Sequence, residues 1–213
     1  MMHAVFFAVV VELFTSQGCS SCPPADALLK ELRRDPNVIA IAYHVDYWDS
    51  LGWRDPFSAK AWTQRQMEYV RTLKLPSAYT PQIVVDGSRQ RVGSNAVAVR
   101  TAIAAAQREE HNAPPMRLTS ENGSAVVVTN APRAGLELVV VALSDEQTTK
   151  IERGENAGLT LANANIARKL VRIPNVAAGP HTYRVPSLAG EKLVAILQDP
   201  ATLHIVSATA IGR

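Results

Sequence analysis

Cysteine is scarce, because the 213 residues include only two, Cys19 and Cys22. Two cysteines exclude a scaffold held by several disulfides and a zinc site built from cysteine alone. The formal net charge is only +3 and the basic residues are scattered, so charge favours neither nucleic acid nor an acidic membrane surface as a partner. The composition, 47% hydrophobic and 19% charged, is that of a globular protein.

A long hydrophobic run is also missing. The longest, Ala4–Val11, is well short of the ~20 residues that span a bilayer. It makes a poor signal peptide, because no Lys or Arg precedes it and it leads into Glu12 without a small-residue cleavage site. We interpret Val5–Phe14 as a buried strand, and expect either a cytosolic protein or a leader upstream of Met1.

Aromatic residues are nearly absent from the second half of the chain. Of the four Phe, three Trp and five Tyr, only Tyr183 lies beyond Tyr79. The stretch His111–Pro115 follows a predicted helix and contains two prolines, which is typical of a linker. We therefore predict two domains, residues 1–112 and residues 113–213.

The first domain alternates predicted strands and helices. Its order, β-α-β-α-β-β-α, predicts an α/β fold in which helices cover a central sheet. Apolar residues recur at helical spacing after Pro23 and again after Asn95, giving each helix one core-facing stripe. The expected strands are Val5–Phe14, Val38–Val45, Gln82–Val85 and Arg89–Val92, and the expected helices begin at Pro23, at Asp55-Pro56 (running to about Leu73) and at Ser94 or Asn95.

The second domain carries short strand patterns separated by turn residues, which favours an antiparallel, β-sandwich-like domain. One interruption, Gly154–Arg168, is expected to be a loop followed by a short helix. The expected strands are Ala125–Thr129, Leu136–Leu143, Lys169–Ile173, Thr182–Val185, Lys192–Leu197 and His204–Ala208.

The strongest functional signal is Cys19-Ser20-Ser21-Cys22, which lies between a predicted strand and the helix that Pro23 opens. A helix N-terminus presents free amides and a partial positive charge, which stabilise a thiolate at Cys19. Cys22, one turn deeper, is placed to attack a mixed disulfide and release the partner. Two alternatives stay open, a pair of buried core thiols and half of a zinc site completed by distant histidines.

The segment Tyr79–Gly87 resembles the thioredoxin superfamily, whose members place a cis-proline before a short strand, facing the CxxC motif. The resemblance implies that Pro81 is this proline and that Thr80, next to Tyr79, pairs with the backbone of a bound substrate. The alternative is an ordinary trans-proline turn. The resemblance also implies that Glu12, the one charge in the first strand, exchanges a proton with the inner cysteine, against the alternative of an acid that meets water at the end of a strand.

A longer set of motifs resembles a bacterial family catalogued only as a domain of unknown function. This resemblance covers most of the chain and implies a thioredoxin-like fold with a β-rich C-terminal part, a periplasmic or secreted location, and no established substrate. The sequence departs from the family in lacking the usual leader. The motifs are Val11–Asp26, His44–Asp49, Leu51–Phe57, Arg65-Gln66, Tyr79–Gln82 and Glu152–Gly158.

The segment His44–Phe57 is acidic and aromatic, and it follows the second predicted strand. Ligands of open α/β sheets bind at this edge, so we expect the segment to lie near Cys19. His44, Tyr47 and Trp48 are candidates for selecting a partner, and the alternative is an irregular loop whose aromatic rings fill the core. Gly154–Gly158 is either a loop that folds back over the thiols or a plain edge connection.

The leading hypothesis is therefore a thiol–disulfide oxidoreductase that acts on protein or small-molecule thiols and needs no cofactor and no metal. Cys19, Cys22, Pro81 and Glu12 would be catalytic, and Thr80, Tyr79, His44, Tyr47 and Trp48 would bind substrate. A second hypothesis is a copper-chaperone-like protein that uses Cys19, Cys22 and His44, because thiolate and imidazole suit Cu(I). A third is a non-enzymatic interaction protein that binds through its β-rich domain.

Overall fold

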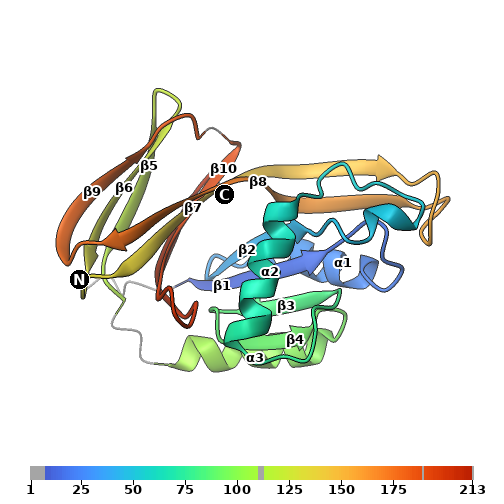
Figure 1. Cartoon of the computed structure of the whole chain (residues 1–213), viewed down its shortest axis with the longest axis horizontal. Helices are drawn as coiled ribbons and strands as arrows, with labels where there is room; N and C mark the ends of the chain where they lie inside the picture. The colour runs from blue at the N-terminus through green and yellow to red at the C-terminus, as the bar shows by residue number, and fades with distance from the viewer. Residues whose placement is uncertain (1–7, 110–112, 189, 213) are drawn as a thin grey trace.

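The computed structural model describes residues 8–109, 113–188 and 190–212, and it shows a mixed α/β protein with one large sheet, one small sheet and few helices (Figure 1). The start of the first expected strand, residues 5–7, and the linker residues 111 and 112 lie outside the described residues. Within those ranges, no helix has both the length and the apolar character needed to cross a membrane.

The first half follows the predicted element order closely. Parallel β1 and β2 lie side by side, and β3 pairs antiparallel with β1 on its other edge. The hairpin between β3 and β4 turns at Asp86 and Gly87, which both have positive φ, as the Asp-Gly pair predicts. The elements are β1 (Val9–Thr15), α1 (Pro23–Leu32), β2 (Val38–His44), the 3-10 helix η1 (Asp49–Leu51), α2 (Lys60–Thr72), β3 (Gln82–Val85), β4 (Arg89–Val92) and α3 (Ala96–Arg108).

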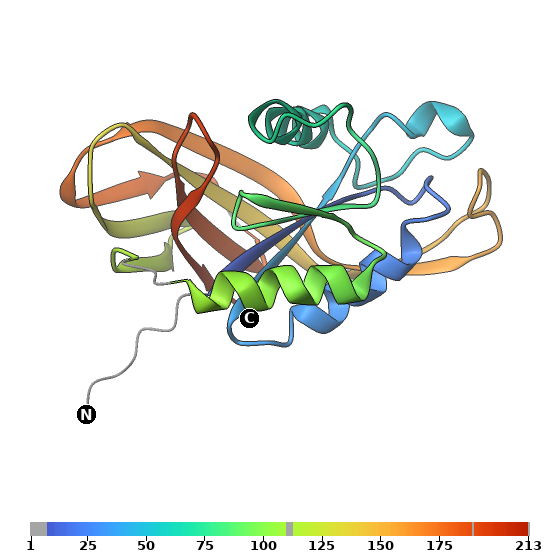
Figure 2. The same ribbon diagram turned by 90° about the horizontal axis from the view of Figure 1, so that it is seen from below.

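Helices cover both faces of these strands. Figure 2 shows α1 and α3 on one side and α2 on the other. Because side chains alternate along a strand, Val9, Val11 and Leu13 of β1 pack with α1 and α3, whereas Val10 and Phe14 pack on the α2 side. The predicted helix stripes are buried as expected, and Asn95 caps α3 by accepting a hydrogen bond from the Ala98 amide.

The second half continues the same sheet. The eight strands run in the order β11-β10-β7-β8-β2-β1-β3-β4, and β8 joins β2 in parallel at the pair Ala42 and Ile166. A three-stranded sheet, β5-β6-β9, packs against β7 and β10 through a shared apolar core. The division into two domains at residue 112 stays a prediction. The strands are β5 (Met116–Glu121), β6 (Ser124–Ala131), β7 (Leu136–Lys150), β8 (Thr160–Val176), β9 (Gly179–Val185), β10 (Lys192–Gln198) and β11 (Ile205–Ile211).

Three local predictions were wrong. The second helix begins at Lys60 and not at Asp55. Asp55 accepts the Phe57 amide through one carboxylate oxygen, but this makes only a turn, and the Gln17 amide and the His44 ring bind the other oxygen. The helix expected within Gly154–Arg168 is the first half of β8, where pairing with β7 and β2 overrides the helix propensity of its alanines. Strand β5 was not predicted.

Candidate functional site

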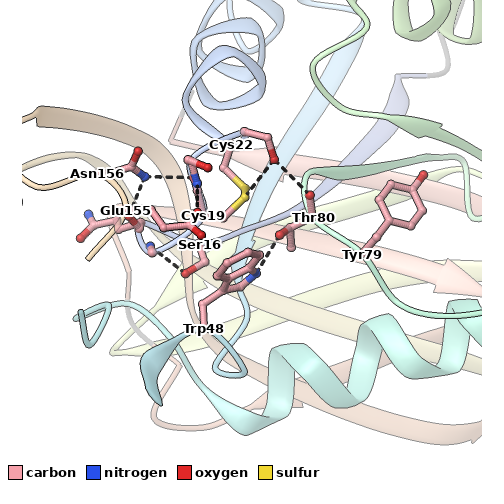
Figure 3. The surroundings of a disulfide bond; sticks show 12 residues. Ser16, Cys19, Cys22, Trp48, Tyr79, Thr80, Glu155 and Asn156 are labelled. Carbon is pink, nitrogen blue, oxygen red and sulfur yellow. Dashed lines mark hydrogen bonds between the residues drawn. A yellow bond between two sulfur atoms is a disulfide. The ribbon is translucent and has the colours of Figure 1, made fainter. Parts of the chain in front are cut away.

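The two cysteines form a disulfide at the start of α1 (Figure 3). Cys22 is the residue that caps the helix, and Pro23 follows as its first residue. The Cα atoms of Cys19 and Cys22 lie 5.4 Å apart, within the usual range for a disulfide. Both side chains are buried, whereas Ser20 and Ser21 between them are exposed.

A cis peptide bond between Thr80 and Pro81 faces this disulfide. The hydroxyl of Ser21 links the two features, because it lies 3.4 Å from the Cys19 sulfur and donates to the Thr80 carbonyl at 3.5 Å. The Trp48 indole donates to the Thr80 hydroxyl at 2.8 Å. The cis conformation predicted for Pro81 is thus confirmed. The start of α1, the segment 44–57 and the residues that lead into β3 meet at this place.

His44 is fully buried and turned towards Asp55, with its Nδ1 atom 2.7 Å from the carboxylate. Burial lowers the pKa of His44, but the charge and hydrogen bond of Asp55, together with the charge of Asp26, raise the pKa overall. The reverse holds for Asp55, where burial raises the pKa, but the His44 charge and the hydrogen bonds from His44, Gln17 and Phe57 together lower it. The two side chains therefore form a buried ion pair, which orients the loop that precedes the cysteines.

That loop is held mainly through Gln17. Its amide donates to Asp55 at 2.8 Å, and its side-chain nitrogen donates to the Asn163 oxygen at 2.9 Å. Its side-chain oxygen accepts from the Trp53 indole at 3.2 Å. The Trp53 indole thus helps to fix the residue two positions before Cys19.

The connection between β7 and β8, residues 151–159, also reaches the disulfide (Figure 3). The buried Asn156 amide donates to the carbonyls of Gln17 and Cys19, each at 2.9 Å. The Glu155 carboxylate accepts from the Ser20 amide at 3.0 Å. Of the two predictions for Gly154–Gly158, the loop that folds back over the cysteine motif is the confirmed one.

Asp26 is the buried carboxyl group on the same helix as Cys22. Its amide donates to the Cys22 carbonyl at 3.1 Å, so the two residues are one helical turn apart and their Cβ atoms are neighbours at roughly 5–6 Å. Burial raises the pKa of Asp26 from 3.8 to about 7, although the nearby His44 charge opposes the rise. One carboxyl oxygen, Oδ2, has no hydrogen-bond partner among the described residues.

Glu12 lies on the other face of the sheet, the one that α2 covers. Arg65 of α2 donates to its carboxylate at 2.6 Å, and the Tyr69 hydroxyl donates to the second oxygen. All three side chains are fully buried. Because α1 packs on the opposite face, the structure does not bring Glu12 and the cysteines together.

Tyr47 and Tyr79 flank the cis peptide. The Tyr47 hydroxyl donates to the Gln66 side chain at 3.2 Å, and Gln66 in turn donates to the Tyr79 carbonyl at 2.8 Å. The Tyr79 hydroxyl donates to the side chain of Gln90 on β4. Tyr47 is 38% exposed and the neighbouring Leu51 is 59% exposed, so an apolar surface borders the site.

A family described as a protein of unknown function, DUF1223, matches residues 10–198. The chain belongs to the DUF1223 family. A crystal structure of protein AGR_C_4864 from Agrobacterium tumefaciens is similar, with a TM-score of 0.82, 29% identity, and coverage of 96% of this chain and 94% of that one. HBP35 of Porphyromonas gingivalis shares the fold at 16% identity and a TM-score of 0.66, over 97% of this chain and 75% of the other. A comparison with curated proteins finds no match.

Sequence analysis did not single out two residues of the site in this DUF1223 protein. Asp26 stands in the first turn of a helix, where an acid is expected for its favourable interaction with the helix dipole, so nothing distinguished it. Asn156 lies within Gly154–Gly158, the segment expected to fold back over the thiols, but it lies 137 positions from Cys19 and nothing singled it out from its neighbours. In the described ranges, no group of three or more His, Cys, Asp and Glu side chains is arranged to hold a metal.

Proposed function

We propose that this DUF1223 protein is a thiol–disulfide oxidoreductase of thioredoxin-like architecture. The observation that carries the proposal is the Cys19–Cys22 disulfide at the N-terminus of α1, joined through Ser21 to the cis Thr80–Pro81 peptide. Both sulfur atoms are buried, but Ser20 and Ser21 between them are exposed, so the motif lies just below the surface of the protein. The substrate class is a disulfide or dithiol carried by an extended peptide or a small molecule.

The reaction is a two-electron exchange between two sulfur pairs. In the reduced protein the Cys19 thiolate attacks a substrate disulfide, which forms a mixed disulfide and releases one substrate thiolate. Cys22 then loses its proton and attacks the Cys19 sulfur, which releases the second substrate thiolate and forms the Cys19–Cys22 bond. The substrate gains two electrons and the protein loses two, and the reverse sequence oxidises a substrate dithiol.

Asp26 is our candidate for the group that takes the Cys22 proton, in place of Glu12. It shares a helix face with Cys22, and a pKa of about 7 lets it accept and release a proton near neutral pH. A surface groove of about 240 Å³ between α1 and β8 is lined by Asp26, Lys30 and Asn163, among others. This groove gives the carboxyl group a route to exchange its proton with solvent.

The substrate would lie across the cis peptide. Thr80 and Tyr79 offer backbone groups to an extended chain, in the way a sheet edge captures a peptide. Trp48, fixed by its bond to Thr80, and the exposed Tyr47 would contact its side chains. His44 would not touch substrate, because it is fully buried and paired with Asp55.

The test is reduction of a peptide disulfide by the pre-reduced protein. Cys19→Ser should abolish turnover, and Cys22→Ser should accumulate a mixed disulfide that mass spectrometry detects on Cys19. Ser120→Ala is the control, because Ser120 is an exposed serine on β5 of the three-stranded sheet, and it should keep full activity. Full turnover by Cys19→Ser would disprove the function.

A further inference from the structure

The β7–β8 loop, residues 151–159, belongs to the second half of the chain but docks on the cysteine motif. Its own backbone bonds keep it compact, with Ile151 and Leu159 paired at 2.9 Å and the Gly158 amide bonded to the Ile151 carbonyl at 2.8 Å. Gly154, with φ +79, packs against Trp53 so closely that a Cβ there would lie 3.1 Å from the Trp53 Cβ. The loop is therefore held together by its own hydrogen bonds and packs against the segment 44–57.

In this position, Asn156 and Glu155 bind the backbone of three residues in and just before the cysteine motif, Gln17, Cys19 and Ser20. Asn156 is 3% exposed, and its side-chain nitrogen donates hydrogen bonds to the carbonyls of Gln17 and Cys19. Glu155 is solvent-exposed and accepts the Ser20 amide. Hydrogen bonds from the side chain and the amide of Ser20 lower the pKa of Glu155, so its carboxylate is charged at neutral pH.

The charge has a consequence for the neighbouring sulfur. A free amide at the start of α1 stabilises a Cys19 thiolate, but the Ser20 amide is already bonded to an anion. We propose that Glu155 and Asn156 are positioning residues of the thiol site, which hold the Cys19 loop and use the Glu155 charge to restrain thiolate formation at Cys19. This inference rests on the proposed function and assigns the β7–β8 hairpin a part in it.

Other charges also face the motif. Asp26 lies behind Cys22 on α1, and the His44–Asp55 pair lies beneath Gln17. All three are buried and stay unchanged in the variants below. Glu155 is exposed, so salt should screen its effect on the pKa of Cys19, whereas salt should screen the effects of the three buried groups much less.

The experiment measures the alkylation rate of Cys19 by iodoacetamide from pH 5 to 9, in a Cys22→Ser background so that only one thiol reacts. Glu155→Gln keeps an oxygen that accepts the Ser20 amide but removes the charge. It should raise the rate below pH 7 about threefold, the factor that corresponds to half a pKa unit, and shift the profile towards lower pH. The increase should disappear in 1 M salt.

Glu152→Gln is the matched control, because Glu152 lies in the same loop, is exposed, and makes no hydrogen bond or ion pair with any described residue. It should leave the profile unchanged. Asn156→Ala should undock the loop, so adding Glu155→Gln to it should produce no further change. Equal effects of Glu155→Gln and Glu152→Gln, or full additivity with Asn156→Ala, would overturn the inference.

The two proposals fail separately. Alkylation reports the reactivity of Cys19 whether or not the protein turns over a disulfide. A protein that never reduces a peptide disulfide but shows the Glu155 effect would lose the proposed function and keep the inference. A protein that reduces a peptide disulfide normally but shows no Glu155 effect would keep the proposed function and lose the inference.

Discussion

Replacing Asp26 by Asn should stabilise the oxidised protein, by an amount that grows with pH. The Asp26 carboxyl is only 7% exposed, and one of its oxygens has no hydrogen-bond partner in the described part of the chain. An ionised carboxylate is costly in such a place. Burial accordingly raises the pKa of Asp26 from 3.8 to about 7.

The sign follows from proton binding. Between about pH 4 and pH 7 the folded protein holds the Asp26 proton and the unfolded chain has lost it, so rising pH favours unfolding. Each pKa unit corresponds to about 1.4 kcal/mol, so the group removes about 4 kcal/mol of stability over this window. Asn has nearly the same shape and cannot ionise, so the variant escapes this loss.

The assay is urea unfolding of oxidised wild type and Asp26→Asn at pH 4.5, 6, 7 and 8, with Glu152→Gln as a surface control. The difference in the free energy of unfolding between Asp26→Asn and wild type should increase by about 3 kcal/mol between pH 4.5 and pH 8 and level off above pH 8. The same variant should slow the release of a mixed disulfide, since Cys22 loses its proton acceptor. A stability difference that is constant with pH would refute the reasoning.

Three further substitutions test a buried ion pair and two turns of the fold. Glu12→Gln leaves the Arg65 guanidinium buried without its counter-charge and should cost about 3–5 kcal/mol in urea unfolding, while the activity of the folded fraction stays unchanged. Gly87→Ala places a Cβ 1.9 Å from the Leu203 carbonyl at φ +68 and should prevent stable folding, whereas Gly123→Ala, at φ +74 with nothing within 4 Å, should cost only about 1–2 kcal/mol. Equal losses at the two glycines would contradict this account of the β3–β4 turn.

The sequence predicted what local chemistry determines. The stripe of α1, the Asp-Gly turn at Gly87 and the cap at Asn95 each depend on residues within a few positions of one another. Cys19 and Cys22 were found because their spacing and the following proline are visible in a single turn of chain. The cis-proline came from a resemblance and not from local chemistry, yet it too occupies one short motif.

The errors occurred where distant segments decide the outcome. Asp55 precedes a proline, as helix caps often do, and one of its carboxylate oxygens does accept the Phe57 amide. Its other oxygen is bound by the His44 ring and the Gln17 amide, and no local pattern shows this. Residues 160–168 contain several alanines and so favour helix on propensity, but they pair with β7 on one side and β2 on the other. Glu12 was assigned a catalytic role from its place in the first strand. Its side chain points to the face that α2 covers, so it pairs with Arg65 and not with the cysteines.

The register of β8 links the fold to the candidate site. Asn163 accepts a hydrogen bond from the Gln17 side chain, and Asn165, with φ +51, donates to the Ala40 carbonyl on β2. The Asn165 bond fixes the position of β8 beside β2, and the Asn163 bond joins β8 to the loop that precedes the cysteines. Together they set how far the β7–β8 hairpin extends towards the cysteines. A slip of one residue would turn Asn163 to the opposite face of the sheet and carry Asn156 away from Cys19. The continuous sheet is thus what allows a residue 137 positions away to contact the reactive loop.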